Sequence, residues 1–499
     1  MKLSRRLSRL KSAGPGSSVP SSLPARVDDQ EARAVASETP AANLDIQPER
    51  VCTDAKERVR LARIGHLRNL IADFDARARV RAAAEAEAQK AALLASGGQP
   101  RALPGETVET PHGQVRLAEL LLPPEHCHGK TPVQAGLQAQ ADMLARLAFD
   151  AEIEGVDLSG ALFLDTETTG LSGGTGTIPF LVGYARYEEG ALKVYQLFLE
   201  APGLEAPMLE VLREAVEACT VIVTYNGKAY DWPLLNTRFV LNRVAPPSPR
   251  PHLDLLHIAR RLFRARIGSA RLVTMEEQVL GMWRERDIDG AEIPGVYWSY
   301  LRHRDPTQMA TVMEHNVNDL VALAALMGVV SDKYTALHPH DDPVDHLCLA
   351  RVAVRADDTS RALLFARAAA EGGAEAEVAT QACLLLGELL RKTGEYSSAT
   401  KAYEDGLRAA SEDEELAAPL HLALAKLHEH RTKDLVRALT HARHTTLEEG
   451  REDQQRRVAR LERRIVRRAE VQAQQQRVQA KKLRRAQQAG ASAPALASP

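Results

Sequence analysis

Long apolar runs are missing from this sequence of 499 residues. The longest, Leu320 to Val330, is well short of the roughly 18 to 20 residues that a membrane-spanning helix needs. Cysteine is scarce as well: the five cysteines are scattered and form no Cys-x-x-Cys pair, which argues against a disulfide framework and a cysteine-rich zinc site. We therefore expect a cytoplasmic protein without a transmembrane segment.

Neither sign of charge predominates, because 64 Lys and Arg balance 66 Asp and Glu to a net charge of -2. This balance excludes a uniformly polybasic protein. Residues 1–48 start with a basic stretch and continue rich in Pro and Ser, which predicts a disordered arm. A transit peptide and an amphipathic arm that touches membrane or nucleic acid are alternatives. Residues 49–104, rich in Ala, Arg, Glu and Leu, predict a helical connector.

The middle of the chain changes from one pattern to another. Residues 105–158 predict a small α+β lead-in, with two short extended pieces around Pro111–Gly113 and a helix from Val133 to Phe149. Residues 159–332 predict one mixed α/β domain, in which a meander of three strands precedes alternating helix and strand. The expected strands are Ala161–Leu164, Phe180–Tyr187, Leu192–Leu199 and Thr220–Tyr225.

Beyond Pro343 the pattern is helical and repeats itself. The spacing of Leu, Gly, Tyr and Ala from Leu386 to Leu407 matches a tetratricopeptide repeat, so residues 344–470 predict an all-α repeat domain that offers a surface to a protein partner. An unspecialised helical bundle is the alternative. Residues 471–499 predict a basic tail that ends in disorder, either solvated or in contact with nucleic acid.

The first candidate site lies on the strand that ends in DTETTG. Side chains on a strand repeat every two residues, so Asp165 and Glu167 project from the same face. Two carboxylates this close raise each other's pKa unless a cation lies between them. The pattern therefore favours a divalent metal ion, although Asp-x-Glu is also common on solvated strands.

Two later segments add acidic groups. Asp231 follows the strand Thr220–Tyr225 at the start of a helix, where open α/β sheets place their sites and where an Asp also serves as an N-cap. His315 and Asp319 are four residues apart on a predicted helix and therefore share a face.

The order DTETTG, YNGKAYDWPLL and HNVNDLVAL resembles the three motifs of the ribonuclease H-like DEDD 3′-5′ exonucleases, most closely the bacterial YprB-type branch. The resemblance covers about residues 160–332. It implies a ribonuclease H-like fold that hydrolyses phosphodiester bonds from a 3′ end by a two-metal mechanism. It also implies that two Mg²⁺ or Mn²⁺ ions, which prefer oxygen ligands, are held by four carboxylates: Asp165, Glu167, Asp231 and Asp319.

His315 is the predicted proton acceptor, but its position departs from the family pattern. Four residues before the last Asp the tyrosine branch has Tyr, and five residues before it the histidine branch has His. Here His315 stands at the tyrosine spacing and Glu314 at the histidine spacing, which leaves the branch open. A helix-start histidine with a local hydrogen bond is the alternative.

Substrate contacts are predicted at two places. Near the motifs, Thr168 and Asn226 are candidates for holding the terminal nucleotide, and Tyr225 or Trp232 for stacking on a base, with a core position as the alternative for each aromatic. Further along, residues 236–272 hold eight arginines and one acid. Arginine binds phosphate oxygens, so this segment predicts a basic rim, or else a solvated helix face. The chosen contacts are Arg260, Arg261 and Arg264.

Together with the repeat pattern, the resemblance implies a metal-dependent 3′-5′ exonuclease followed by helical repeats. The rival hypothesis is a scaffold that binds nucleic acid without cleaving it and recruits a protein through its repeats. The sequence does not separate DNA from RNA substrates. His126–His128 carries two histidines but no second ligand pair, so a zinc site is not expected there.

Overall fold

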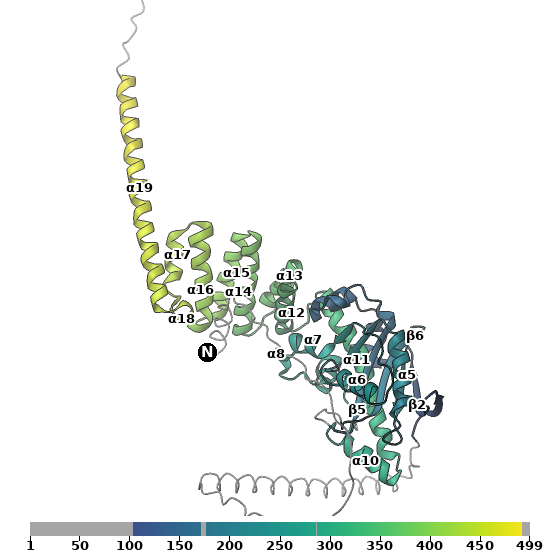
Figure 1. Cartoon of the computed structure of the whole chain (residues 1–499). Coiled ribbons are helices and arrows are strands. Elements are labelled where there is room, and N and C mark those ends of the chain that lie inside the picture. Colours follow the sequence, from purple (N-terminus) through teal and green to yellow (C-terminus); the bar gives the residue numbers. More distant parts are fainter. Residues whose placement is uncertain (1–102, 171–175, 286, 492–499) are drawn as a thin grey trace, which may run out of the picture. The chain divides into compact units, whose positions relative to one another are not determined.

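A computed structural model describes residues 103–170, 176–285 and 287–491, with side chains placed as far as residue 485 (Figure 1). The predicted disordered arm, the predicted helical connector and the end of the predicted tail lie outside these residues. Across the described residues, no helix is long and apolar enough to cross a membrane.

The core of the first half is one seven-stranded sheet, in the order β1-β2-β7-β6-β5-β8-β9. Neighbouring strands from β1 to β5 are antiparallel, whereas β5, β8 and β9 run parallel. The predicted mixed sheet is thus confirmed. The strands are β1 Glu106–Thr110, β2 Gly113–Leu122, β5 Ala161–Thr168, β6 Pro179–Glu188, β7 Ala191–Phe198, β8 Val221–Thr224 and β9 His252–Asp254, and a separate small pair comprises β3 Cys127–His128 and β4 Thr131–Pro132.

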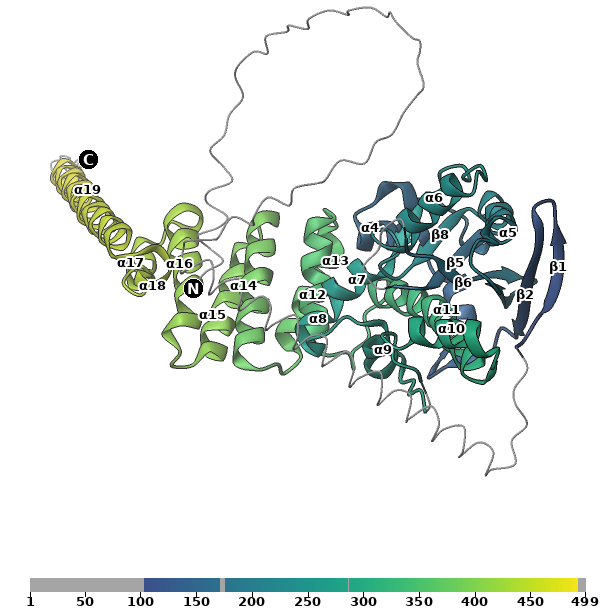
Figure 2. The ribbon, with the colours of Figure 1, turned by 60° about the horizontal axis from the view of Figure 1, so that its bottom comes forward.

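Helices cover both faces of this sheet (Figures 1 and 2). Phe163 faces a core shared with α4, α7 and the middle of α11, whereas Leu162 and Leu164 face a core shared with α5, α6 and α10. This alternation is what places residues 165 and 167 on the α11 side. The helices are α3 Gln134–Leu137, α4 Ala141–Ala148, α5 Glu205–Ala218, α6 Asp231–Leu241, α7 Leu255–Leu262, α8 Arg264–Ile267, α9 Leu272–Met275, the π-helical η4 Glu276–Leu280, α10 Ile293–His303 and α11 Thr307–Thr335.

The first part of residues 105–158 is built into the same sheet, because Arg116 to Leu122 of β2 pair with β7. The single helix expected from Val133 to Phe149 is wrong: it is interrupted between α3 and α4, where Gln140 is extended and donates its N–H to Ser331 Oγ at 2.8 Å. The interruption lets α3 approach α11 so closely that a Cβ on Gly136 would overlap the Ala324 carbonyl.

The second half consists of antiparallel helix pairs, which is consistent with repeats. A Cβ on Gly387 of α14 would overlap the Tyr403 ring of α15, so the small residue in the repeat pattern permits the close crossing. The apolar core runs on from α11 into these helices, and Arg266 of α8 forms a two-bond ion pair with Asp345 of α12. The helices are α12 Pro343–Arg355, α13 Thr359–Glu371, α14 Ala376–Thr393, α15 Tyr396–Ala410, α16 Glu414–Leu427, the π-helical η5 His428–Thr432, α17 Leu435–Ala442, α18 Thr446–Glu449 and α19 Arg451–Ala491.

Candidate active site

Strand β5 carries the first two acidic side chains. Asp165 and Glu167 point from one face of the strand, and Thr166 points from the other. The pairing of β5 with β6 shifts register between Glu167 and Thr168, a bulge at the end of the strand next to the acidic groups. The sheet therefore presents both carboxylates at one end of a central strand.

Asp231 follows the end of β8 and lies near enough for its charge to raise the pKa of Asp165 and of Glu167. It is the first residue of α6, but the cap position belongs to Tyr230 and the Asp231 carboxylate accepts a hydrogen bond from the Thr166 hydroxyl. The N-cap alternative thus does not describe this residue. Burial raises the pKa of Asp231 to about 6, against the opposing effect of the Thr166 hydrogen bond.

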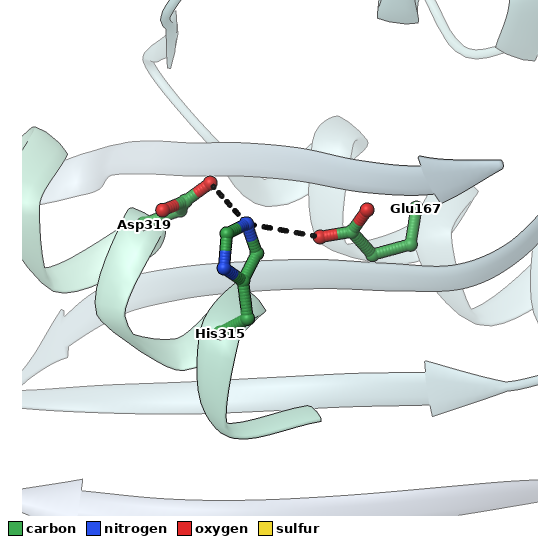
Figure 3. Close-up of side chains that lie close together, drawn as sticks. All are labelled: Glu167, His315 and Asp319. Carbon is green, nitrogen blue, oxygen red and sulfur yellow. Dashed lines mark ion pairs between the residues drawn. The ribbon is translucent and has the colours of Figure 1, made fainter. Parts of the chain in front are cut away.

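Helix α11 supplies the remaining two groups. His315 lies between two carboxylates: its Nε2 is 3.6 Å from Asp319 Oδ2 and 3.9 Å from Glu167 Oε1 (Figure 3). The ligand atoms of these three residues all lie within 4.8 Å of one another, close enough to share one metal ion. Side chains from β5 and α11 thus lie close together.

The four acidic side chains of the site carry more negative charge than the neighbouring cationic side chains can balance. Burial, followed by the nearby carboxylates, raises the pKa of Asp165 well above its ordinary value. Burial also raises the pKa of Glu167 to about 8, although the His315 charge works in the opposite direction. The pKa of Asp319 is raised by burial despite His315 and Arg284. Buried oxygen donors with excess negative charge fit a hard divalent cation such as Mg²⁺ or Mn²⁺.

One neutral side chain holds Asp165 in place. Asn316, fully buried on α11, donates its Nδ2 to Asp165 Oδ2 at 2.8 Å and accepts a bond from Gln196 Nε2 at 2.9 Å. Gly183, the β6 residue paired with Asp165, leaves the room for it, since a Cβ there would overlap the Asn316 side chain. Sequence reasoning missed Asn316, although it lies inside the third motif.

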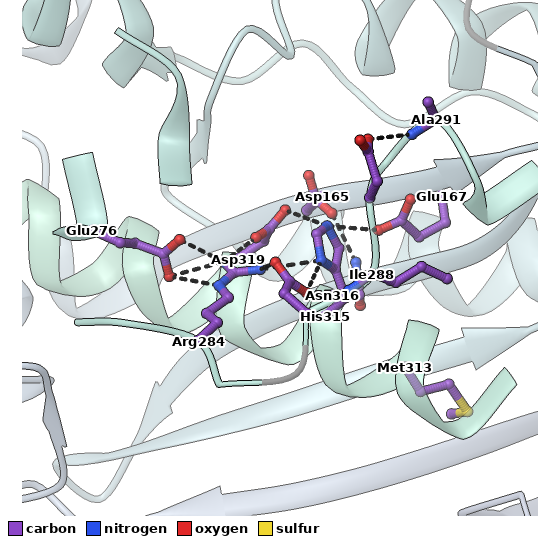
Figure 4. Close-up of polar contacts among 12 residues, drawn as sticks. Asp165, Glu167, Glu276, Arg284, Ile288, Ala291, Met313, His315, Asn316 and Asp319 are labelled. Atoms are coloured by element: carbon purple, nitrogen blue, oxygen red, sulfur yellow. Dashed lines mark hydrogen bonds and ion pairs between the residues drawn. The ribbon is translucent and has the colours of Figure 1, made fainter. Parts of the chain in front are cut away.

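A buried arginine also enters the site from the segment after η4 (Figure 4). Arg284 Nη2 donates to Asp319 Oδ1 at 2.5 Å and to Glu276 Oε1 at 2.8 Å, while Nη1 lies 3.0 Å from Asp287 Oδ2. Behind it, Glu276 is fully buried, and its Oε1 lies 2.7 Å from His128 Nε2. The network pins the guanidinium and fixes one oxygen of Asp319.

His315 has a carboxylate partner that the motifs do not include. Its Nδ1 lies 2.6 Å from Asp287 Oδ1. A proton on Nδ1 would be donated to Asp287, which leaves Nε2 of the neutral ring facing Glu167 and Asp319. Burial lowers the pKa of His315, but the Asp287 hydrogen bond and the two other carboxylates raise it overall. No signal in the sequence marked Asp287, because it stands in an irregular segment.

A pocket of about 320 Å³ opens beside Glu167. Thr168 and Asn226, both predicted substrate contacts, line it together with Tyr230 and Pro294. Tyr230, which sequence reasoning missed, donates its hydroxyl to the Gly170 carbonyl at 2.7 Å. The site therefore combines an acidic cluster with an adjoining pocket that has both polar and apolar walls.

Two comparisons with known proteins bear on this geometry. A sequence profile of the RNase H superfamily matches residues 162–331. Over 296 residues, 59% of this chain and 70% of the relative, the chain is 31% identical to the uncharacterized protein YprB of Bacillus subtilis (strain 168). The chain belongs to the YprB family. Through its RNase H superfamily domain it is placed among the nucleic-acid hydrolases, which generally use divalent metals.

The other predicted substrate contacts of this YprB-family chain lie outside the pocket. Tyr225 turns its hydroxyl to the Ala270 carbonyl at 2.7 Å, and Trp232 packs against the core beside His252. Arg261 donates to the Leu147 carbonyl at 2.8 Å and covers a phenylalanine ring.

Several of the eight arginines are thus held inside the fold. Arg250 and Arg266 also pair with carboxylates, those of Glu217 and Asp345. Arg260 and Arg264, by contrast, are exposed on α7 and α8. These two remain available for a basic rim, whereas Arg261 does not face solvent freely.

Proposed function

We propose that this chain is a metal-dependent 3′-5′ exonuclease. The observation that carries the proposal is the convergence of four carboxylates with raised pKa values from three elements, β5, α6 and α11, next to a pocket. The proposed ligands of two Mg²⁺ or Mn²⁺ ions are Asp165, Glu167, Asp231 and Asp319. When bound, such ions lower the pKa of water and stabilise charge on phosphate oxygens.

Side chains of the protein perform the other roles in the proposed reaction. His315 Nε2 accepts a proton from the attacking water, and Asp287 holds the ring so that this nitrogen stays free. Asn316 and Arg284 orient Asp165 and Asp319, each through one oxygen. Thr168, Asn226 and Tyr230 bind the terminal nucleotide in the pocket beside Glu167.

The test is hydrolysis of labelled DNA and RNA, single- and double-stranded, by the full chain in Mn²⁺. A label at the 5′ end should give a ladder that shortens one nucleotide at a time, and a label at the 3′ end should appear at once as mononucleotide. EDTA and Asp165→Asn should each abolish both signals. Cleavage that persists in EDTA, or internal cuts without stepwise shortening, would refute the proposal.

The design also separates the rival scaffold hypothesis. A chain that binds these strands without cleaving any of them, while Asp165→Asn binds equally well, would be a nucleic-acid-binding protein and not an enzyme. Circular dichroism of Asp165→Asn controls for folding.

A further inference from the structure

Helix α19 consists of two parts that differ in what surrounds their cations. In the first part Leu461 is buried against α17, and three arginines surround one carboxylate. Arg460 and Arg464 each approach Glu429 to 2.8 Å, and Arg457 approaches it to 3.5 Å. Arg468 makes the last contact with the repeats, a 3.0 Å bond to the Lys433 carbonyl. The first part is thus anchored by burial and ion pairs.

The second part of α19 carries charge without packing. Every residue from Val466 to Arg485 is exposed, and Glu470 is the only acid among them. Figure 1 shows this end of the helix extending beyond α17 and α18. Six cations here have no ion pair or hydrogen bond in the part of the chain that the structure describes: Arg467, Arg477, Lys481, Lys482, Arg484 and Arg485.

These cations face largely one way. At about 100° per residue, the six fall within an arc of about 160° around the helix axis. Of the four large apolar side chains exposed on this part, Val466, Val471 and Val478 lie within the same arc and only Leu483 lies outside it, so the large apolar side chains do not form a separate face with which the helix could enter a membrane surface. The like charge of two such helices also opposes pairing with a second copy of this chain.

We propose that residues 466–485 of α19 bind the phosphate backbone of duplex DNA. Repeated, one-sided positive charge complements a polyanion, and the glutamines from Gln472 to Gln479 add neutral donors to phosphate. The helix has no aromatic residue, so it lacks the stacking surface on which single-strand sites depend. This inference rests on the proposed action on nucleic acid and adds a second contact away from the carboxylates.

The shape of the helix favours B-form DNA over duplex RNA. A helix with its side chains is about 10–12 Å across, and the major groove of B-DNA is about 12 Å wide. The major groove of A-form RNA is deep and narrow and does not admit a helix. Because the contacts are to phosphates, the binding should be independent of base sequence and sensitive to salt.

The experiment measures the affinity of the full chain for a labelled 24-base-pair DNA duplex, by fluorescence anisotropy in EDTA over a range of salt. The test variant replaces three cations on one side of the free helix, Arg477→Gln, Lys481→Gln and Arg484→Gln. The matched control removes the same charge from exposed positions of the repeats, Arg367→Gln, Lys392→Gln and Lys401→Gln. Glutamine keeps the helix propensity in both.

The test variant should weaken binding on the order of tenfold at 50 mM salt and reduce the slope of log K against log salt by about 2 to 3, since each neutralised phosphate contributes about 0.9. The control should leave the slope unchanged. Equal effects of both variants, or none from either, would overturn the proposal, as would tighter binding of single strands or of duplex RNA than of duplex DNA. EDTA prevents cleavage, so a chain that never cleaves nucleic acid but passes this test refutes only the proposed nuclease.

Discussion

Buried carboxylates in two regions of this chain, Glu429 beside α19 and Glu167 in the candidate site, have pKa values shifted in opposite directions. Burial is the largest influence on Glu429 and on Glu167, and in each case it raises the pKa. Around Glu429 the arginines of α19 outweigh burial, and its pKa ends below the ordinary value. Around Glu167 they are missing, and its pKa rises to about 8.

The difference distinguishes a structural ion cluster from a site that needs an outside cation. Glu429 is already neutralised by its own chain and gains nothing from a metal. The four site carboxylates share one arginine and one histidine, so most of their charge stays uncompensated. A folded protein keeps such an arrangement only where a ligand or a function offsets its cost.

The distinction between the two regions would fail if His315 only neutralised charge in the acidic site, as the arginines around Glu429 do. We expect instead that His315→Ala lowers the turnover rate about 10²- to 10⁴-fold, the usual effect of losing a general base. Asp287→Asn should cause a smaller loss in the same direction, because it releases the ring. The exposed His340→Ala serves as control. Wild-type turnover in His315→Ala would assign the proton to another group.

The two kinds of carboxylate should also differ in whether their replacement lowers or raises the free energy of unfolding. Glu429→Gln leaves the arginines of α19 without their partner and should lower the free energy of unfolding by about 3 kcal/mol, as when a buried ion pair is broken. Asp165→Asn removes a charge that the folded state disfavours and should be neutral or stabilising without metal, since an amide oxygen still accepts the Asn316 bond. Urea unfolding in EDTA at pH 7.5 measures both. Destabilisation of similar size in the two variants would contradict the distinction.

The sequence was sufficient for the central strands of the sheet and for the faces on which the acidic residues lie, because both follow short-range rules. Alternation along β5 put Asp165 and Glu167 on one face, and the helical period put His315 and Asp319 together. The attachment of β2 to β7 was out of reach, because it joins residues far apart in the chain. The same limit explains why residues 105–158 read as a separate lead-in.

Local composition predicted less well which charged side chains are free to bind a substrate. Arg250 and Arg266 belonged to a predicted basic rim, but their partners are carboxylates 33 and 79 residues away. Arg284 and Asp287 stand in an irregular segment whose neighbours give no periodic signal, so their approach to α11 depends on the packed fold. Asn316 was hidden for another reason: a fully buried amide in a helix resembles any core polar residue until its partners are known.

A third cluster consists of histidines, which are cationic when protonated, instead of carboxylates. Its expected effect on stability is the smallest of those predicted. Four histidines gather on α16, on η5, on α17 and just after α17. His421 and His441 place their Nδ1 atoms 3.0 Å apart, the His444 ring stacks on His421, and the His428 ring stacks on His441. Burial, then the neighbouring histidines and Arg437, lowers the pKa of His441 to about 4. Asp434 and Glu404, which favour the charged form, act on His428.

The unfolded chain therefore binds more protons than the folded one between about pH 6.5 and 4, so this cluster costs stability as the pH falls through that range. From pH 7.5 to 5, wild type should lose on the order of 1 kcal/mol more than His441→Leu, in which one titrating group is gone. The acidic site shifts with pH too, but it is common to both proteins and cancels in their difference. Urea midpoints at the two pH values, with His340→Leu as control, measure this difference. If wild type and His441→Leu lose the same stability, the buried histidines do not titrate as a cluster.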